Sequence, residues 1–157
     1  MNIAIIPARI GSKRIKKKNI KKFNKFPIIY YSIKAALNSK LFDDVIVSTD
    51  SKEIAKVAIS LGANVPFLRT KNLSSDNVPI IDVISDTIDN YIKKYDKKIS
   101  FACCILPTAP MIQVSDIKLG LKKILTNKYT YVFSASQFEY PLQRAFVLGN
   151  NDYIKKY

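Results

Sequence analysis

The stretch Asn2-Ile3-Ala4-Ile5-Ile6-Pro7 is a short, continuous apolar run at the start of the chain. A strand that is apolar at every position, rather than at every second position, is typical of a parallel sheet covered on both faces. Runs of similar character follow along the chain, so we expect further strands at residues 44–49, 65–68, 100–106 and 130–134.

Stretches with helical spacing lie between these runs, at residues 28–39, 50–62, 79–94 and 115–126. We expect Pro27 to open the first helix, an Asp50–Glu53 capping box to begin the second, and Ser115 to cap the last. Gly62 is expected to end the second helix. Alternating strands and helices predict an α/β fold with a mainly parallel sheet and helices on both faces.

The composition bounds the domain count and the chemistry. The 157 residues, 48% hydrophobic and 24% charged, predict one globular domain over residues 1–157. No apolar run approaches the roughly 18 residues of a membrane span, and the N-terminus does not resemble a signal peptide. The chain has no histidine, which excludes Ser-His-Asp triads, histidine-ligated zinc and imidazole acid–base catalysis.

Cys103 and Cys104 are the only cysteines of the chain, and they are adjacent. Neighbouring strand residues point to opposite faces, so the pair is badly placed to hold one metal. We interpret them as small apolar residues of a buried strand. Two cysteines without a secretion signal predict a cytoplasmic protein.

Positive charge is concentrated in one segment, residues 9–25, which we call the basic loop. It holds nine of the 26 basic residues and no acid, whereas the rest of the chain has 17 basic against 12 acidic residues. Such a segment can bind a polyphosphate, contact nucleic acid or form a solvated face. Gly11 and Ser12 favour the first interpretation, since small residues let backbone N–H groups approach an anion, with Arg9 and Lys13 supplying full charges.

Four polar segments follow the ends of the predicted strands. They are the basic loop, Asp50, residues 69–77 and residues 107–110. Ligands of parallel α/β sheets bind outside the carboxyl ends of the strands, so we expect the four segments to form one site.

The residues of these segments also resemble those of a known family. Ile-Pro-Ala-Arg-x-Gly-Ser-Lys-Arg at 6–14, followed by Lys18-Asn19, resembles the N-terminal signature of the CMP-sialic acid synthetase family of cytidylyltransferases. Three further blocks are similar to the family in the same order, at residues 47–55, 62–76 and 106–110. Residues 107–110 and 139–146 resemble the pseudaminic acid cytidylyltransferases most.

The resemblance implies a Rossmann-like nucleotide-diphospho-sugar transferase fold. It also implies a reaction in which CTP and a nine-carbon 2-keto sugar acid give a CMP-sugar and pyrophosphate, with Mg²⁺ as cofactor. Arg9 and Lys13 would be the catalytic cations that hold the triphosphate, and Gln143 and Arg144 would bind the sugar acid. The implied nucleotide-binding residues are Ala8, Arg9, Gly11, Ser12, Lys13, Asn19, Arg69, Asp76 and Thr108.

The chain also departs from the family pattern. Family members usually carry small hydroxyl residues where this chain has Val78-Pro79-Ile80. They also continue well beyond this length, and the later region supplies the expected Mg²⁺-binding aspartate and the dimer interface. We therefore expect a chain that lacks the family's C-terminal part, name no metal ligand, and expect a homodimer only at full length.

Alternatives stay open for the substrate, the function class and two residues. The alternative sugar acid is an N-acylneuraminate or a related acid, and a basic nucleic-acid-binding module is the alternative of another class. We predict neither nucleic acid nor membrane as a partner, because the predicted strand and helix aromatics do not alternate with basic residues on one surface. Arg69 either binds nucleotide or pairs with Asp76, and Asp50 is either an N-cap or part of the site.

Overall fold

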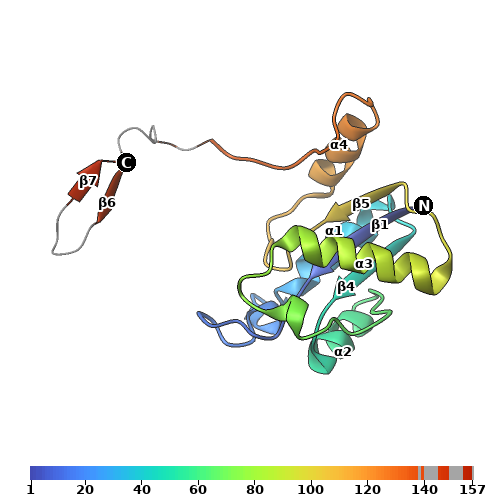
Figure 1. Ribbon diagram of the computed structural model, residues 1–157, viewed down its shortest axis with the longest axis horizontal. Coiled ribbons are helices and arrows are strands. Elements are labelled where there is room, and N and C mark those ends of the chain that lie inside the picture. Colours follow the sequence, from blue (N-terminus) through green and yellow to red (C-terminus); the bar gives the residue numbers. More distant parts are fainter. Residues whose placement is uncertain (138, 140–144, 149–153, 157) are drawn as a thin grey trace.

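Strand β1 (Asn2–Pro7) is the central strand of a three-stranded parallel sheet (Figure 1). The computed structural model describes residues 1–137, 139, 145–148 and 154–156. Strand β4 (Asp44–Ser48) pairs with one edge of β1, and β5 (Phe101–Cys104) pairs with the other edge. The parallel sheet expected from the apolar runs is thus confirmed.

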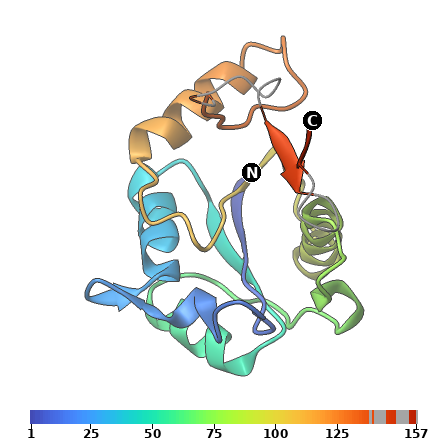
Figure 2. The same ribbon diagram turned by 90° about the vertical axis from the view of Figure 1, so that its left-hand side faces the viewer.

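Helices cover both faces of the sheet, as predicted (Figure 2). Helix α3 (Ile80–Tyr95) packs Ile84 and Tyr91 on the face that carries Ile3 and Ile5. Ala4 and Ile6 point to the opposite face, where their cluster includes residues of α1 (Ile29–Ser39), α2 (Lys52–Ser60) and α4 (Val114–Ile124). Among the described residues, no helix has both the length and the apolar character of a membrane span.

The predicted start of α2 is wrong by one residue. Ser51, not Asp50, is the N-cap, and its hydroxyl accepts a hydrogen bond from the Ile54 N–H at 3.3 Å. The Asp50 carboxylate instead accepts a hydrogen bond from the Ile10 N–H at 2.9 Å. Long-range contact with the basic loop therefore decides the role of Asp50.

The predicted caps of two other helices also differ from the structure. Gln113 begins α4 in a capping box with Asp116, so Ser115 lies inside the helix. Pro27 belongs to β3 (Phe26–Pro27), which pairs with β2 (Lys22–Phe23) in a short antiparallel hairpin, and α1 begins two residues later.

Two of the predicted strands are not formed as regular strands. The segment around residues 64–68 runs along the outer edge of β4 through two single bridges, Ile46 with Asn64 and Thr49 with Leu68. Residues 130–134 form no strand, and the side chains of Tyr131 and Phe133 are 75% and 84% exposed. An apolar run needs a neighbouring strand to pair with, and no described strand lies beside this one.

The last described residues of the chain form a separate hairpin. Strands β6 (Phe146–Leu148) and β7 (Ile154–Lys156) pair with each other in antiparallel orientation. Figure 1 shows this hairpin well apart from the parallel sheet.

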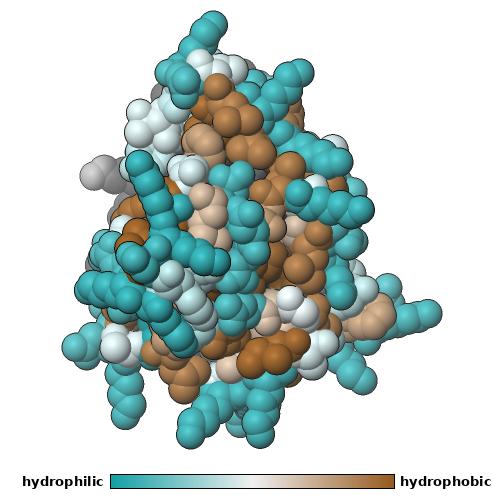
Figure 3. Space-filling model, turned by 90° about the vertical axis from the view of Figure 1, so that its right-hand side faces the viewer, coloured by the Kyte–Doolittle hydropathy of each residue, from teal (hydrophilic) through white to brown (hydrophobic). Residues whose placement is uncertain are grey.

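The interpretation of the cysteines as buried strand residues is wrong for Cys104. Its side chain is exposed and that of Cys103 is partly buried, and both thiols are free. Cys104 pairs in register with Ile5 on the face covered by α3, but it is not among the residues that pack in the cluster under this helix. Figure 3 shows apolar side chains gathered on the side of the molecule that lies at the right in Figure 1.

Candidate functional site: a cationic cluster at the carboxyl end of the sheet

Arg9 and Lys13 meet at one carboxylate just beyond the end of β1. The Arg9 guanidinium forms an ion pair with one oxygen of Asp76, and the Lys13 Nζ lies 2.7 Å from the other oxygen. A second nitrogen of Arg9 donates to the Ser74 carbonyl at 3.4 Å. The structure thereby brings together two of the predicted phosphate-binding cations and the predicted nucleotide-binding aspartate.

Asp76 is negatively charged in this cluster. Hydrogen bonds from Lys13 and Arg9 hold the pKa of its carboxyl below the ordinary value. The cluster therefore carries one net positive charge, and its two cations are neutralised only in part. A phosphate chain that displaced the carboxylate would meet both cations at once.

Asn19 is buried inside the basic loop rather than turned to the surface. The residue is only 4% exposed, and its side-chain amide nitrogen donates to the Arg9 carbonyl at 2.8 Å. Asn19 lies in the short 3₁₀ helix η1 (Lys18–Ile20), which follows Lys17 in the left-handed conformation. The predicted contact of Asn19 with nucleotide thus has a competitor in the loop's own backbone.

The predicted backbone cradle at residues 8–13 is only partly available. The Ala8 side chain is fully buried in the core and its N–H donates to the Ser48 carbonyl, which leaves neither group for a ligand. The Ser12 N–H donates to the Ile10 carbonyl at 2.8 Å. Among the described residues, the N–H groups of Gly11 and Lys13 have no hydrogen-bond partner. A Cβ at Gly11 would meet nothing within 4 Å, so the fold alone does not require glycine there.

Arg69 supports the loop that carries Asp76. Its backbone N–H donates to the Thr49 carbonyl at 2.8 Å, and its Nε donates to the Ser74 hydroxyl at 3.2 Å. Arg69 is 7% exposed, and burial lowers the pKa of its guanidinium, while Asp50 acts in the opposite direction. The alternative of an Arg69–Asp76 pair is wrong, because Arg9 and Lys13 hold that carboxylate.

Three of the four predicted segments converge, and the fourth is not linked to them. Hydrogen bonds from Arg9 to Ser74, from the Ile10 N–H to Asp50, and from the Arg69 N–H to Thr49 join the basic loop, the end of β4 and the loop of residues 69–76. In the described part of the chain, Thr108 makes no hydrogen bond to these segments. Gln143 and Arg144, the predicted sugar-binding pair, lie outside the described residues.

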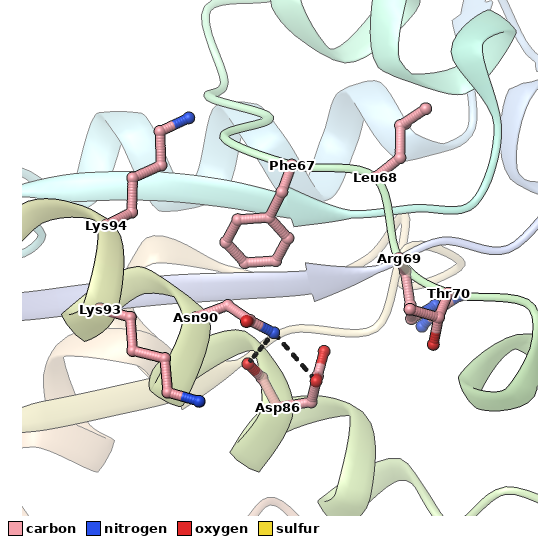
Figure 4. Close-up of a pocket in the computed structure, with 8 residues that line it drawn as sticks. All are labelled: Phe67, Leu68, Arg69, Thr70, Asp86, Asn90, Lys93 and Lys94. Atoms are coloured by element: carbon pink, nitrogen blue, oxygen red, sulfur yellow. Dashed lines mark hydrogen bonds between the residues drawn. The ribbon is translucent and has the colours of Figure 1, made fainter.

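A hollow of about 360 Å³ lies next to this cluster, between the segment Phe67–Thr70 and α3 (Figure 4). Arg69 lines both the hollow and the cluster. On α3, the Asn90 amide donates to the Asp86 side chain and carbonyl, each at 2.9 Å. Arg69 is thus the residue through which the hollow adjoins the cluster.

The described residues do not form a ready metal site. No group of three or more Asp, Glu or Cys side chains comes together in the part of the chain that the structure describes. The carboxylates nearest the cluster are engaged, Asp76 by two cations and Asp50 by the Ile10 N–H. We therefore assign Mg²⁺ no ligand among the described residues, and the predicted cofactor stays a prediction.

Sequence reasoning did not assign Ser74 any role. Its carbonyl accepts from Arg9 and its hydroxyl accepts from Arg69, so Ser74 joins both arginines to the loop that carries Asp76. The only signal in the sequence was its place between Leu73 and Asp76, within one of the blocks that resemble the family.

The chain is similar to known cytidylyltransferases along most of its length. Residues 3–143 match the family model described as "Cytidylyltransferase". The pseudaminic acid cytidylyltransferase of Campylobacter jejuni (serotype O:2) is 42% identical over 98% of this chain, which spans 66% of that protein's length. The CMP-N,N'-diacetyllegionaminic acid synthase of Legionella pneumophila is 41% identical over 74% of this chain and 50% of its own length.

Solved structures share the fold. A CMP:2-keto-3-deoxy-manno-octonic acid synthetase complexed with CTP superposes with a TM-score of 0.67 at 21% identity, covering 80% of this chain and 48% of the other. A cytidylyltransferase from Leptospira borgpetersenii superposes with a TM-score of 0.62 at 22% identity, covering 81% and 50%. The Rossmann-like nucleotidyltransferase fold predicted from the sequence is confirmed.

Proposed function

Because this chain belongs to the cytidylyltransferase family, we propose that it carries the triphosphate-binding part of an enzyme that couples CMP to a nine-carbon sugar acid. The observation that supports this most directly is the meeting of Arg9 and Lys13 at the carboxyl end of β1. The chain spans about two thirds of its Campylobacter relative, so the activity concerns the whole protein.

The proposed reaction forms one bond and breaks one at phosphorus. The anomeric hydroxyl of the sugar acid attacks the α-phosphorus of CTP, loses its proton, and expels pyrophosphate. Positioning and charge neutralisation carry most of the rate in such a transfer. A site without histidine suits this chemistry, because Arg9 and Lys13 stabilise the charge on the phosphates without exchanging protons.

We propose that CTP binds by displacing Asp76 from the two cations. Asp76 and Arg69 belong to a loop that two hydrogen bonds tie to the ends of β1 and β4. Movement of this loop would release the carboxylate toward the nucleoside, as the predicted role of Asp76 in the nucleotide pocket requires.

We propose pseudaminic acid as the sugar acid. Two Campylobacter jejuni relatives named pseudaminic acid cytidylyltransferase are 42% and 41% identical over 98% of this chain. The alternative substrate is an N-acylneuraminate, for which the Escherichia coli cytidylyltransferase is 37% identical over 90% of this chain. Gln143 and Arg144 stay a prediction for the sugar-binding residues.

Mg²⁺, a dimer of the full-length protein and a cytoplasmic location also stay predictions. Mg²⁺ would supply further charge neutralisation on the triphosphate. Comparing the CTP affinity of the chain with and without Mg²⁺ measures the contribution of the metal. The proposed contacts of Arg9 and Lys13 with the triphosphate are present in both measurements.

Calorimetric titration of the chain with CTP, UTP, ATP and GTP tests the proposed function. We expect CTP to bind most tightly, and Arg9→Ala to weaken binding about 10- to 100-fold, as loss of a hydrogen bond to a charged group does. Replacing Lys16 and Lys21 instead is the matched control, since these lysines form no ion pair with a described residue. Equal affinity for all four nucleotides would reduce the site to a general phosphate loop.

The nucleic-acid alternative gains one observation from the structure. Phe23 and Phe26 are 45% and 42% exposed on the hairpin that also carries Lys22 and Lys25. Phe26 stacks on Tyr30 with ring centroids 4.1 Å apart, so its ring is already partly occupied. Duplex binding no tighter than about 10⁻⁶ M at physiological salt, the non-specific range, would support the enzyme, and nanomolar duplex binding that CTP does not disturb would favour the alternative.

A further inference from the structure

One peptide unit of the basic loop is held at both of its polar groups. The carbonyl of the Arg9–Ile10 peptide accepts a hydrogen bond from the Asn19 amide at 2.8 Å. The N–H of the same peptide donates to the Asp50 carboxylate at 2.9 Å. Two side chains from different parts of the chain thereby fix the plane of the peptide that carries Arg9.

Both holding residues are themselves well anchored. Asp50 follows β4 directly, after Thr49, which is fully buried and whose carbonyl accepts from the Arg69 N–H. Because Ser51 caps α2, the Asp50 carboxylate is left for the loop. Asn19 is 4% exposed and closes the loop on itself across ten positions of the sequence.

The charge of Asp50 is unexpected at a phosphate site. It lies close enough to Arg69 to influence that guanidinium, in a region otherwise dominated by Arg9, Lys13 and Arg69. An extra carboxylate repels phosphate, so its place there needs another reason. Its hydrogen bond to the Ile10 N–H supplies one, because it fixes the backbone from which Arg9 extends.

We infer that Asp50 and Asn19 are positioning residues that clamp the Arg9–Ile10 peptide and so aim Arg9 at the triphosphate. This rests on the proposed function, in which Arg9 contacts the triphosphate. The Arg9 side chain is long and 32% exposed, so a fixed starting point for it reduces the freedom lost when it binds.

The test compares four variants: Asp50→Ala, Asp50→Asn, Asn19→Ala and, as matched control, Glu53→Gln. Glu53 is an acid only three positions from Asp50, but it pairs with Lys17 at 2.7 Å, outside the clamp. CTP and inorganic triphosphate are titrated by calorimetry. We expect Asp50→Ala to weaken binding of both ligands about 10-fold or more, from the size of one charge-assisted hydrogen bond, and Asn19→Ala about fivefold, from the size of a neutral one.

Asp50→Asn separates the hydrogen bond from the charge. Its side-chain oxygen can still accept from the Ile10 N–H, so we expect affinities within about threefold of the unchanged chain, a small part of a full hydrogen bond. An Asp50→Asn variant as weak as Asp50→Ala would overturn the inference, because charge and not positioning would then matter. Glu53→Gln should behave as the unchanged chain, and a comparable loss there would also overturn it.

A double-mutant cycle distinguishes positioning from general damage. In the Arg9→Ala background, Asp50→Ala should cost almost nothing further, since the side chain that it positions is gone. Additive losses would overturn the inference. Thermal unfolding of each variant identifies any that fails to fold, and if Asp50→Ala does so, the cycle is measured with Asn19→Ala in its place.

Hydrogen exchange of the Ile10 amide reads the clamp without any ligand. We expect exchange to accelerate in Asp50→Ala and to stay slow in Asp50→Asn and Glu53→Gln, whereas equal exchange in all three would overturn the clamp. If the unchanged chain binds no CTP while the amide behaves as expected, the proposed function fails and the clamp stands. If CTP binds and Asp50→Ala changes nothing, the clamp fails and the function stands.

Discussion

The two strands that flank β1 have the same direction but different surroundings. Ile46 of β4 and Cys104 of β5 pair with opposite sides of the same residue, Ile5, and share its face of the sheet. Ile46 is fully buried, whereas Cys104 is exposed. Beyond β4 lies the segment of residues 64–68, which bridges to Ile46 and Thr49, while the described residues place no strand beyond β5.

This difference shows that the β4 side of the sheet is better packed than the β5 side. The β4 side carries the covered edge and the connections of the cationic cluster, through Asp50 and Thr49. The β5 side contributes residues 107–110, which make no described hydrogen bond to that cluster. The site and the best-packed part of the sheet thus lie on the same side of β1.

Truncating Ile46 and Cys104 to alanine should show the largest difference in stability between the two flanks of the sheet. Ile46→Ala should destabilise the chain by about 2–5 kcal/mol, the cost of a buried cavity. Cys104→Ala should change stability by no more than about 0.5 kcal/mol, as at exposed positions. Denaturant unfolding of both variants measures this, and equal costs would show that the two flanks are packed alike.

Thiol labelling compares the accessibility of Cys103 and Cys104, the two cysteines of β5. Burial raises the pKa of Cys103 to about 11, and it also raises that of Cys104. The thiolate is the reactive form, so only roughly one Cys103 thiol in 10,000 is reactive at pH 7. We expect Cys104 to be labelled first, and the rate at Cys103 to rise about tenfold per pH unit up to about pH 11. Mass spectrometry of timed reactions measures labelling at both cysteines, and faster labelling of Cys103 would contradict the exposed position of Cys104.

Tyr91 tests the covered side of the sheet. Its hydroxyl donates to Asp44 at 3.0 Å, and the Asn64 amide donates to the same carboxylate oxygen at 2.9 Å. Tyr91→Phe should therefore cost about 1 kcal/mol, the typical worth of a hydrogen bond.

The pH dependence of this bond has a definite sign. Burial and Asp44 raise the pKa of Tyr91 to about 12, above the ordinary value of 10.0. Its contribution is fully present below about pH 10 and is lost between about pH 10 and pH 12, because the unfolded chain releases the proton first. Thermal unfolding should thus show a smaller difference between the unchanged chain and Tyr91→Phe at pH 11 than at pH 8. A constant difference would contradict the hydrogen bond.

Asp76→Asn should have the smallest effect, a gain of only a few-fold in affinity for inorganic triphosphate. The change removes the charge that competes with phosphate for Arg9 and Lys13, and exposed ion pairs contribute about 0–1 kcal/mol. Stability should stay unchanged. Calorimetry with inorganic triphosphate and with CTP separates two roles: weaker binding of CTP alone would indicate that Asp76 contacts the nucleoside.

The sequence predicted the sheet well because its central strands are continuous apolar runs. The run at residues 2–7 is buried at four consecutive positions, Ile3 to Ile6, as its composition indicates. The run at residues 101–104 is equally apolar but alternates between partly buried and exposed positions. A sequence reveals which residues favour burial, but the neighbours that cover them depend on the whole fold.

The site was predicted less completely, because local patterns compete with long-range contacts. Arg9 and Lys13 were selected from their charge beside Gly11 and Ser12, Asp76 was selected from the family resemblance, and the three side chains meet. Asp50 matched a capping box, yet its partner is an amide 40 residues away. Asn19 resembled a ligand-binding residue, yet it binds the loop backbone. Neither partner leaves a trace in the neighbouring sequence.

Since no described strand covers the outer edge of β5, association of copies through that edge should depend on ionic strength. An edge strand with free backbone groups accepts another strand, and exposed apolar side chains around it favour the contact. The chain also carries a net charge of +14, which keeps copies apart in dilute buffer. The Debye length falls from about 10 Å at 0.1 M salt to about 3 Å at 1 M. At high salt the repulsion between copies is therefore screened, and the edge of β5 favours association of copies that dilute buffer keeps apart.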